Sequence, residues 1–400
     1  MEEKELIRWP RLVVGVITLL FAGVIYAWSI LNAHFEGVWD ATQLGLNYTL
    51  TVIFFCLGGF SSGLLSKKIS SNIRIIISGA LLFTGFFITA NLSGGSVIPL
   101  YLAYGVLAGT GIGISYNTVI STISAWFPDK QGLSSGILLM GFGISPLIIG
   151  QIADTMGRSD LIGWRLTYII FAVSTGVVLF AASFYIKPPP KGSVFPEPKA
   201  AKKASSSGID YSASEMIRRP SFIKIFIFIM IVAAIGSAAI SFARDIVAEV
   251  GAPVRLAVTT VGMLSIFNGF GRLVSGWLFD NIGMRKTQVV ISCVAVLAPL
   301  VVVFALISDS MILGIIGVCL CGFAYGLGPT MSSVFVAEFY GLKNFSINFG
   351  IINLLSIPAS FAATLAGVVK DSTNSFTIAF VILIVCAVVG FAVNMSIKKA

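Results

Sequence analysis

The chain has 400 residues, of which 56% are hydrophobic and only 11% are charged. Soluble domains carry about 25% charged residues, so this composition excludes a soluble globular protein and indicates a chain that crosses a membrane many times. The formal net charge of +9 does not point to nucleic acid, because the distribution of the basic residues described below accounts for it.

Twelve apolar runs are long enough to cross a bilayer, which takes about 20 mostly apolar residues. The connections are short except for residues 187–220, which are rich in Pro, Ser, Ala and Lys, a composition typical of a flexible linker. We therefore predict an all-α membrane protein of twelve transmembrane helices in two six-helix bundles, residues 1–186 and 221–400, joined by a cytoplasmic linker. The predicted spans are 11–31, 41–65, 73–91, 97–126, 132–155, 164–186, 221–244, 257–280, 286–307, 311–338, 345–369 and 374–396.

The basic residues predict the orientation, because cytoplasmic loops carry an excess of Lys and Arg. With a cytoplasmic N-terminus, 20 of the 26 Lys and Arg residues lie inside, five lie outside, and Arg272 lies in the membrane. We therefore expect a multi-pass protein of the cell (inner) membrane with both termini in the cytoplasm. Because this asymmetry explains the net charge, we expect no nucleic-acid partner.

The two halves are related by a shift of 213 residues. With this shift, the run that begins at Gly63 overlies the run that begins at Gly276, and Lys130 overlies Lys343. Gly109 and Gly113 overlie Gly322 and Gly326 in the same register. The pattern predicts parallel repeats, which are related by an axis along the membrane normal.

Arg272 lies inside the apolar run of the eighth span. A lone guanidinium at this depth costs about 3 kcal/mol on insertion scales, so we expect it to have a partner. That partner is a structural carboxylate or carbonyl, or an anionic substrate. A planar guanidinium binds a carboxylate through two parallel hydrogen bonds, and we favour the substrate.

The segment Gly276-Trp-Leu-Phe-Asp280-Asn-Ile-Gly283-Met-Arg285-Lys286 follows that arginine. It resembles the loop between the second and third spans of each half in the major facilitator superfamily. The first-half copy departs from the motif, because Lys67 stands where the aspartate is expected. For Asp280 and Arg285 we favour a structural role.

A second motif, Ala125-Trp-Phe-Pro-Asp-Lys-Gln-Gly-Leu-Ser-Ser-Gly136, joins the fourth and fifth predicted spans. It is similar to the signature of the oxalate:formate exchangers and the monocarboxylate transporters, which also share an arginine in the eighth span. Asn268 stands where the latter often have an acid, and Ser356 and Ile30 stand at positions of family lysines. With Arg272 as the one intramembrane cation, the resemblance implies a singly charged substrate such as lactate or pyruvate.

Further residues are candidates for substrate binding. Asn268 lies four residues before Arg272, on the same helix face. Tyr116 and Tyr26 match tyrosines that contact substrate in the family, although each is also explained by a hydrogen bond to a neighbouring helix. Asn117 follows Tyr116 in the fourth span, and Tyr325 in the tenth span corresponds, by the resemblance, to an aromatic that lines the cavity of the oxalate exchangers. Asn353 in the eleventh span completes the set, with helix–helix hydrogen bonding as its alternative.

The resemblance implies alternating access, in which two bundles rock about a site near the middle of the membrane. We predict a monomeric secondary transporter, with proton symport of a monocarboxylate as the first hypothesis. Organic-anion exchange and transport of a larger organic anion are the alternatives. We expect no enzyme, because paired intramembrane carboxylates and a histidine cluster are missing from the sequence. Neither a cofactor nor a metal is expected, since the five cysteines lack metal-ligand spacing.

Overall fold

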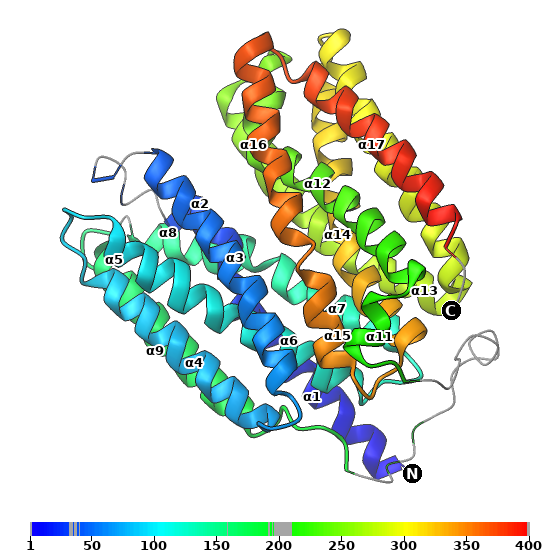
Figure 1. Ribbon diagram of the computed structural model, residues 1–400. Coiled ribbons are helices and arrows are strands. Elements are labelled where there is room, and N and C mark those ends of the chain that lie inside the picture. Colours follow the sequence, from blue (N-terminus) through cyan, green and yellow to red (C-terminus); the bar gives the residue numbers. More distant parts are fainter. Residues whose placement is uncertain are drawn as a thin grey trace. The chain divides into compact units, whose positions relative to one another are not determined.

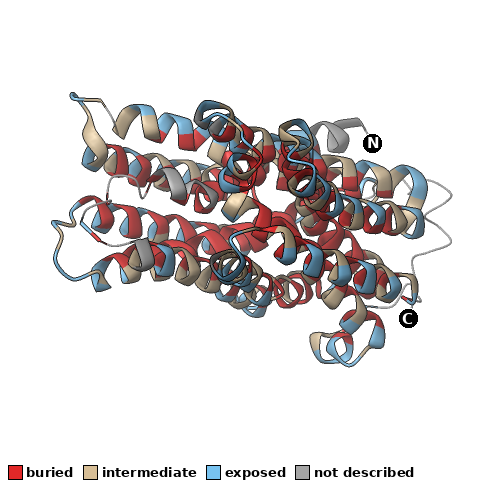
Figure 2. Cartoon of the chain, turned by 90° about the horizontal axis from the view of Figure 1, so that it is seen from above, coloured by how far each residue is buried: buried red, intermediate tan, exposed pale blue. Residues whose placement is uncertain are grey.

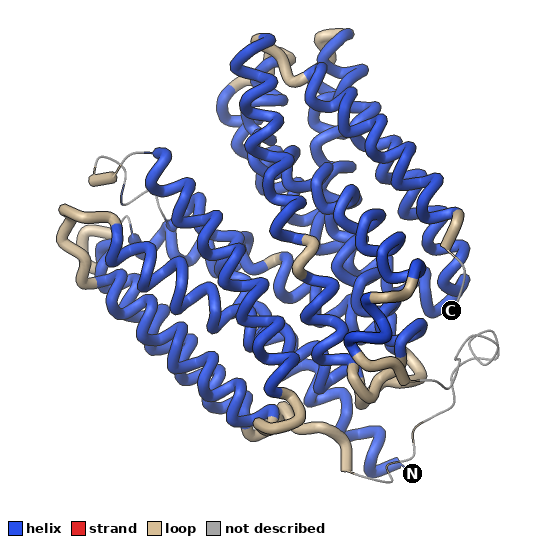
Figure 3. The backbone as a smooth tube through the Cα atoms, in the orientation of Figure 1, coloured by secondary structure: helices blue, strands red, loops and turns tan. Residues whose placement is uncertain are grey.

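A computed structural model describes residues 2–31, 35, 38–39, 41–157, 159–190, 193, 195 and 210–397. Within these ranges the regular structure is helical and contains no strand (Figure 3). His34, the one histidine of the sequence, and most of the predicted linker lie outside the described residues. The all-α fold class predicted from the hydropathy is confirmed.

The helices follow the predicted apolar runs in chain order (Figure 1). In the first half they are α1 (Glu2–Ala22), η1 (Gly23–Ala27), α2 (Trp28–Leu31), α3 (Ala41–Leu65), α4 (Ser71–Ala90), α5 (Ile98–Leu100), η3 (Tyr101–Ala108), α6 (Gly109–Ser124), α7 (Gln131–Gly143), η4 (Pro146–Gly150), α8 (Gln151–Gly157) and α9 (Gly163–Ser183). In the second half they are α11 (Ala213–Ile217), α12 (Pro220–Glu249), α13 (Val254–Ile307), α14 (Met311–Tyr340), α15 (Phe345–Asn353), α16 (Ser356–Thr373) and α17 (Thr377–Met395).

Among the described residues, eleven helical stretches are long and apolar enough to cross a membrane. One of them, α13, contains two crossings, because its backbone leaves the helical conformation at Gly283, where φ is 78° and ψ is 170°. A residue with a side chain is strained at such a φ, which explains the glycine in the loop motif. The helices therefore supply the twelve crossings that the hydropathy predicts.

The fifth and the eleventh spans are interrupted. In the fifth span α7 ends at Gly143, and a π-helical segment, η4, begins at Pro146. Proline removes a backbone donor and disturbs the preceding turn, which accounts for the break in the helix before Pro146. In the eleventh span α15 ends at Asn353 and α16 begins at Ser356, with a short loop between them (Figure 3).

The chain forms two compact units that do not follow the chain order. Unit 1 contains Met1–Asp129, Gly141–Pro198 and Phe345–Leu354, and unit 2 contains Lys130–Met140, Lys199–Asn344 and Leu355–Ala400. The start of the fifth span thus belongs to unit 2, and the start of the eleventh span belongs to unit 1. The division into bundles 1–186 and 221–400 stays a prediction from the sequence.

The repeat is visible in the contacts within each unit. In unit 1 a Cβ atom on Gly113 would overlap the carbonyl oxygen of Phe55, and in unit 2 one on Gly326 would overlap that of Asn268. Gly58 meets the carbonyl of Thr110 in the same way, and Gly271 meets that of Phe323. Each pair is displaced from its counterpart by the 213 residues predicted from the sequence. Both α3 against α6 and α13 against α14 therefore pack backbone to backbone.

Along the helices, buried residues gather on one side and exposed residues on the other (Figure 2). Many exposed residues are large and apolar, including Phe180, Phe304 and Val385. Such side chains suit a lipid environment rather than water. This pattern agrees with a multi-pass membrane protein.

The end of the predicted linker is docked in unit 2 before α12 begins. Tyr211 donates its backbone N–H to the carbonyl of Tyr340 at 3.0 Å, and Asn344 donates its side-chain amide to the carbonyl of Tyr211 at 2.9 Å. Ser212 and Glu215 then form a capping box at the start of α11. The hydrogen bonds from Ser212 lower the pKa of Glu215.

Candidate functional site

Arg272 lies within α13 and is buried in unit 2, with 1% of its surface exposed. Its Nε donates to Oδ1 of Asn268 at 3.3 Å, and its Nη1 donates to the carbonyl oxygen of Leu139 at 3.0 Å. Asn268 precedes Arg272 by one helical turn, so the two side chains share a face, as predicted. The two acceptors are neutral, and they fix the orientation of the guanidinium.

The backbone around Arg272 is held by α14. Thr330 donates its hydroxyl to the carbonyl oxygen of Arg272 at 2.9 Å, and Ser275 donates to that of Leu327 at 3.1 Å. These side-chain bonds link two helices that already pack closely through Gly326. The backbone that carries the arginine is therefore fixed by contacts with α14 on either side of it.

The start of α7 packs against the same stretch of α13. A Cβ atom on Gly136 would lie 2.8 Å from the carbonyl oxygen of Arg272, and Gly132 packs against Gly276 without room for a side chain. The hydroxyls of Ser135 and Ser333 lie 3.0 Å apart, within hydrogen-bond distance. The small residues of the Gln-Gly-Leu-Ser-Ser-Gly half of the signature thus let α7 lie directly against α13 and α14.

Asp280 holds the first turn of α7. Its carboxylate accepts the backbone N–H of Leu133 at 2.7 Å and that of Gly132 at 3.2 Å. A carboxylate is favoured there, because the first backbone N–H groups of a helix lack intrahelical partners and carry a partial positive charge. The structural role predicted for Asp280 is therefore confirmed.

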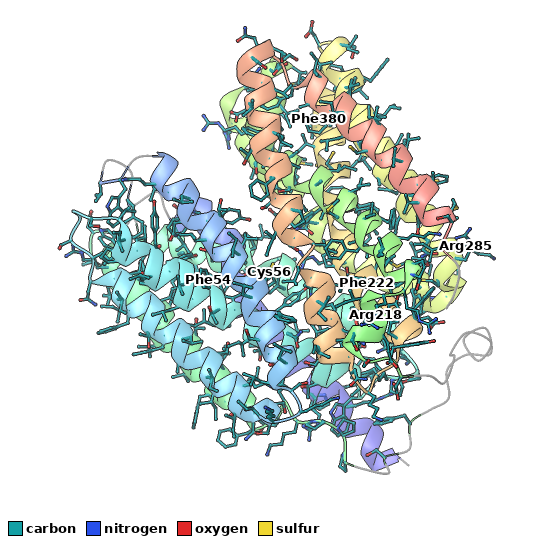
Figure 4. All side chains as sticks on the ribbon, viewed as in Figure 1. Phe54, Cys56, Arg218, Phe222, Arg285 and Phe380 are labelled. Atoms are coloured by element: carbon teal, nitrogen blue, oxygen red, sulfur yellow. The ribbon has the colours of Figure 1, made fainter. Side chains whose placement is uncertain are left out.

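Arg285 places a positive charge at the C-terminal end of α17, whereas Asp280 places a negative charge at the N-terminal end of α7. It donates to the carbonyl oxygens of Asn394 at 3.2 Å and Met395 at 2.6 Å (Figure 4). A cation near the last carbonyls of a helix is favourable. The predicted structural role of Arg285 is also confirmed, and both charged residues of the loop motif act on helix ends.

The Trp-Phe-Pro-Asp half of the signature joins three spans in unit 1. Arg8 of α1 donates to both carboxylate oxygens of Asp129, at 2.7 and 3.3 Å, with 1% and 7% of the two side chains exposed. Trp126 donates its indole N–H to the carbonyl of Lys187, beyond the end of α9, at 2.8 Å. This half of the signature has a structural explanation that the sequence alone did not supply.

Tyr116 and Asn117 lie together on α6 in unit 1. The Tyr116 ring is buried among the rings of Phe55, Phe142 and Phe349, with centroids 5.1, 4.9 and 5.8 Å away. Asn117 donates its amide to the backbone carbonyl of Ser346 at 2.8 Å and accepts the Ser346 hydroxyl at 2.6 Å. Both ends of the Asn117 amide are thus engaged by α15.

Arg74 is a buried cation that the sequence analysis counted among the 20 basic residues on the cytoplasmic side. It lies in the first turn of α4 with 6% of its surface exposed. Its Nη1 donates to the carbonyl and the hydroxyl of Ser62 at 3.1 and 3.0 Å, and lies 3.5 Å from the hydroxyl of Ser346. Its position at the start of the third predicted span, 73–91, was the signal that could have indicated burial.

The remaining candidates fall into the two units separately. Asn353 ends α15 in unit 1, where its carbonyl accepts the thiol of Cys56 at 3.6 Å (Cys56 is labelled in Figure 4). Tyr325 of α14 is half-buried in unit 2, where it packs against Gly236 of α12. Tyr26 lies in η1, and its side chain lies outside the described part of the chain. The structure thus groups Arg272, Asn268 and Tyr325 in unit 2, and Tyr116, Asn117 and Asn353 in unit 1.

Within the described ranges, no group of three or more His, Cys, Asp or Glu residues is placed to hold a metal ion. The five cysteines are free.

The fold and the site define a class of protein: a polytopic helical membrane protein with two repeats that share the same helix contacts, and with a buried arginine in one of its spans. The model of the Major Facilitator Superfamily matches residues 12–364, and the chain belongs to this superfamily. It is therefore a multi-pass membrane transporter of that fold.

Comparison with individual proteins agrees with this assignment. The chain is 27% identical over 354 residues to the uncharacterized MFS-type transporter YhjX of Escherichia coli (strain K12), covering 87% of this chain and 84% of the relative. It is 25% identical over 395 residues to the oxalate:formate antiporter of Oxalobacter formigenes, covering 96% and 90%. It is 21% identical over 413 residues to monocarboxylate transporter 12 of Mus musculus, covering 94% and 82%.

A crystal structure of the fucose:proton symporter FucP of E. coli has the same fold, with a TM-score of 0.70 at 16% identity over 98% of this chain and 99% of that one. The resemblance to the superfamily and to its oxalate:formate and monocarboxylate branch, drawn above from two motifs, is confirmed.

Proposed function

We propose that this transporter moves a small monocarboxylate, of the size of lactate or pyruvate, by alternating access, and that Arg272 binds the carboxylate. The observation that carries the proposal is the buried guanidinium of Arg272 in a membrane-spanning helix, oriented by Asn268 and by the carbonyl of Leu139. A guanidinium presents a planar set of N–H donors that matches the two oxygens of a carboxylate. A bound monocarboxylate also places a negative charge beside the positive charge of Arg272.

The named cargo of two relatives supports this class of substrate. One is an oxalate:formate antiporter and the other a monocarboxylate transporter, and the chain is similar to both over more than nine tenths of its length. The first name favours a second candidate function, exchange of one organic anion for another. Proton-coupled symport of a monocarboxylate remains our first candidate, because the resemblance to the monocarboxylate transporters implies it.

Alternating access accounts for the burial of the arginine. With 1% of its surface exposed, Arg272 meets a substrate only after its neighbours move. The helix α7 is the neighbour whose movement would uncover it, since the Leu139 carbonyl accepts a hydrogen bond from Nη1. Binding of the carboxylate then replaces that neutral acceptor with a charged one.

The other candidates have different support. Asn268 accepts from Nε of Arg272, so we assign it the role of orienting the guanidinium toward the substrate. Contacts of Tyr116, Tyr26, Tyr325 and Asn353 with the substrate remain predictions, as do the cytoplasmic termini and the monomeric state.

The test is uptake of radiolabelled L-lactate into proteoliposomes, with and without an inward proton gradient, for wild type, Arg272→Ala and Arg272→Lys. We expect gradient-driven uptake by the wild type and a loss of at least about 100-fold in Arg272→Ala, since truncating one partner of a buried charged pair costs about 3 kcal/mol or more. Arg272→Lys keeps the charge but loses the planar fork, so we expect partial uptake.

Arg165→Ala is the matched control, because Arg165 is an exposed arginine whose Nη2 donates to the carbonyl of Leu92. It should transport like the wild type. Uptake that requires internal anion, whatever the gradient, would favour exchange. Wild-type uptake by Arg272→Ala would remove Arg272 from the substrate site and refute the proposal.

A further inference from the structure

The eleventh span is divided between the two units. Its first part, α15, packs against α3 and α6 within unit 1 (Figure 1). After the loop at Leu354 and Leu355, α16 continues as a part of unit 2. The helical hydrogen bonding of this span is interrupted between α15 and α16, so the span can bend there. The contacts that hold α15 against α3 and α6 therefore control whether it bends.

The contacts that hold the start of α15 centre on Ser346. Asn117 of α6 forms two hydrogen bonds with it, one through each end of its amide, at 2.6 and 2.8 Å. Close packing adds to this, since a Cβ atom on Gly63 would lie 2.7 Å from the Cα atom of Ile347. Arg74 lies beside the same hydroxyl, 3.5 Å away. We call the Asn117–Ser346 pair the α15 clamp.

The repeat provides an internal comparison. In unit 2 the start of α7 is held by the carboxylate of Asp280, which accepts two backbone N–H groups. The residue 213 positions earlier is Lys67, an exposed cation that follows the end of α3. Apart from the more distant Arg74, 3.5 Å from the Ser346 hydroxyl, the start of α15 is therefore held by a neutral amide, at the place where the other repeat has an anion at a helix N-terminus. Neutral hydrogen bonds are roughly half as strong as charge-assisted ones.

We propose that the α15 clamp is a releasable contact of the transport cycle, and that Asn117 is a positioning residue rather than a ligand of the substrate. The inference rests on the proposed function only in assuming that a transport cycle exists. On this assignment α15 leaves α3 and α6 more readily than α7 leaves α13, and opening of the clamp moves the start of the eleventh span about the break at Leu354 and Leu355.

The chain contains its own reporter for this movement. Cys56 is buried on α3, and its thiol donates to the Asn353 carbonyl at the other end of α15. Release of α15 uncovers this thiol. The probe is N-ethylmaleimide, applied to full-length protein in proteoliposomes after replacement of the other four cysteines by alanine: Cys293, Cys319, Cys321 and Cys386.

We expect Asn117→Ala and Ser346→Ala each to raise the rate of Cys56 alkylation about tenfold, as expected when net hydrogen bonding is lost from a local opening equilibrium. The double variant should match the single variants, because both substitutions remove the same pair of bonds. Ser115→Ala is the control on the same helix, since that hydroxyl bonds only carbonyls of its own helix among the described residues, and its rate should not change.

Transport kinetics distinguish a role of Asn117 in positioning α15 from a role in binding the substrate. Asn117→Ala and Ser346→Ala should change kcat in the same direction and leave KM within about twofold. An increase of KM in Asn117→Ala alone, with Cys56 alkylation as slow as in Ser115→Ala, would make Asn117 a substrate ligand and overturn the inference. Unchanged alkylation in Ser346→Ala overturns it too, and this variant serves if Asn117→Ala does not fold. Alkylation needs no substrate, so a failure to transport lactate leaves this test intact.

Discussion

Replacing Asp280 by Asn tests how the start of α7 is held. The wild-type carboxylate accepts two backbone N–H groups of the first turn, at 2.7 Å from Leu133 and 3.2 Å from Gly132. Hydrogen bonds to a charged group contribute about 1.5–3 kcal/mol, against about 0.5–1.5 kcal/mol for neutral ones. A negative charge at a helix N-terminus adds about 0.3–1 kcal/mol. Because Asn keeps one acceptor oxygen, we expect a net loss of about 2 kcal/mol.

A loss of this size lowers the Tm by about 4 °C in a chain this long. Thermal unfolding of the purified protein in detergent, followed by tryptophan fluorescence, measures the shift. Asn281→Ala is the matched control, because this neighbouring exposed amide donates only to the Trp277 carbonyl of its own helix among the described contacts, and it should stay within about 1 °C of the wild type. If the Tm of Asp280→Asn equalled that of Asn281→Ala, the carboxylate would not hold α7, and the reasoning would be refuted.

Three further predictions concern stability and ionisation. Arg8→Ala should lower stability by about 3–5 kcal/mol, because it leaves the nearly buried carboxylate of Asp129 without its bidentate partner; the Tm measures this, and a shift below about 2 °C would contradict it. Gly136→Ala should cost about 1–3 kcal/mol, since its Cβ would lie 2.8 Å from the Arg272 carbonyl, whereas Gly262→Ala, with no neighbour within 4 Å, should be neutral or stabilising. The lowered pKa of Glu215 means that its capping contribution is complete above the ordinary carboxyl pKa and is lost as the pH falls through the lowered value; an NMR titration that found an ordinary pKa would contradict this.

Hydropathy predicted the spans well because membrane insertion depends on local composition. A run of about 20 apolar residues satisfies its own backbone hydrogen bonds as a helix whatever its neighbours are. The repeat was also accessible, since the glycines at Gly113 and Gly326 recur in the same register and mark the same backbone contact. The loop motif was assigned a structural role because Asp280 lies at a helix end near Arg285 in the sequence; the helix ends that these two residues contact, those of α7 and α17, came from the structure.

Partners in space were not accessible from the sequence. Asn117 was predicted as a substrate ligand because a polar amide stood in an apolar span, and the side chain that engages it, Ser346, lies 229 residues away. Arg74 was counted with the cytoplasmic charges, because that count depends on position along the chain and contains no measure of burial. The assignment of residues 130–140 and 345–354 to units away from the rest of their spans depends on tertiary packing alone.

The recurring glycine contacts also set the limits within which this chain can be altered. At Gly58, Gly113, Gly271 and Gly326 the neighbouring backbone occupies the space of a single methyl group, so even alanine forces two helices apart. A saturation mutagenesis scan under selection for activity should therefore find two matching sets of positions that accept no substitution, 213 residues apart. Mutant libraries designed to change the transported substrate can keep these glycines and vary the polar side chains of α6, α13 and α14.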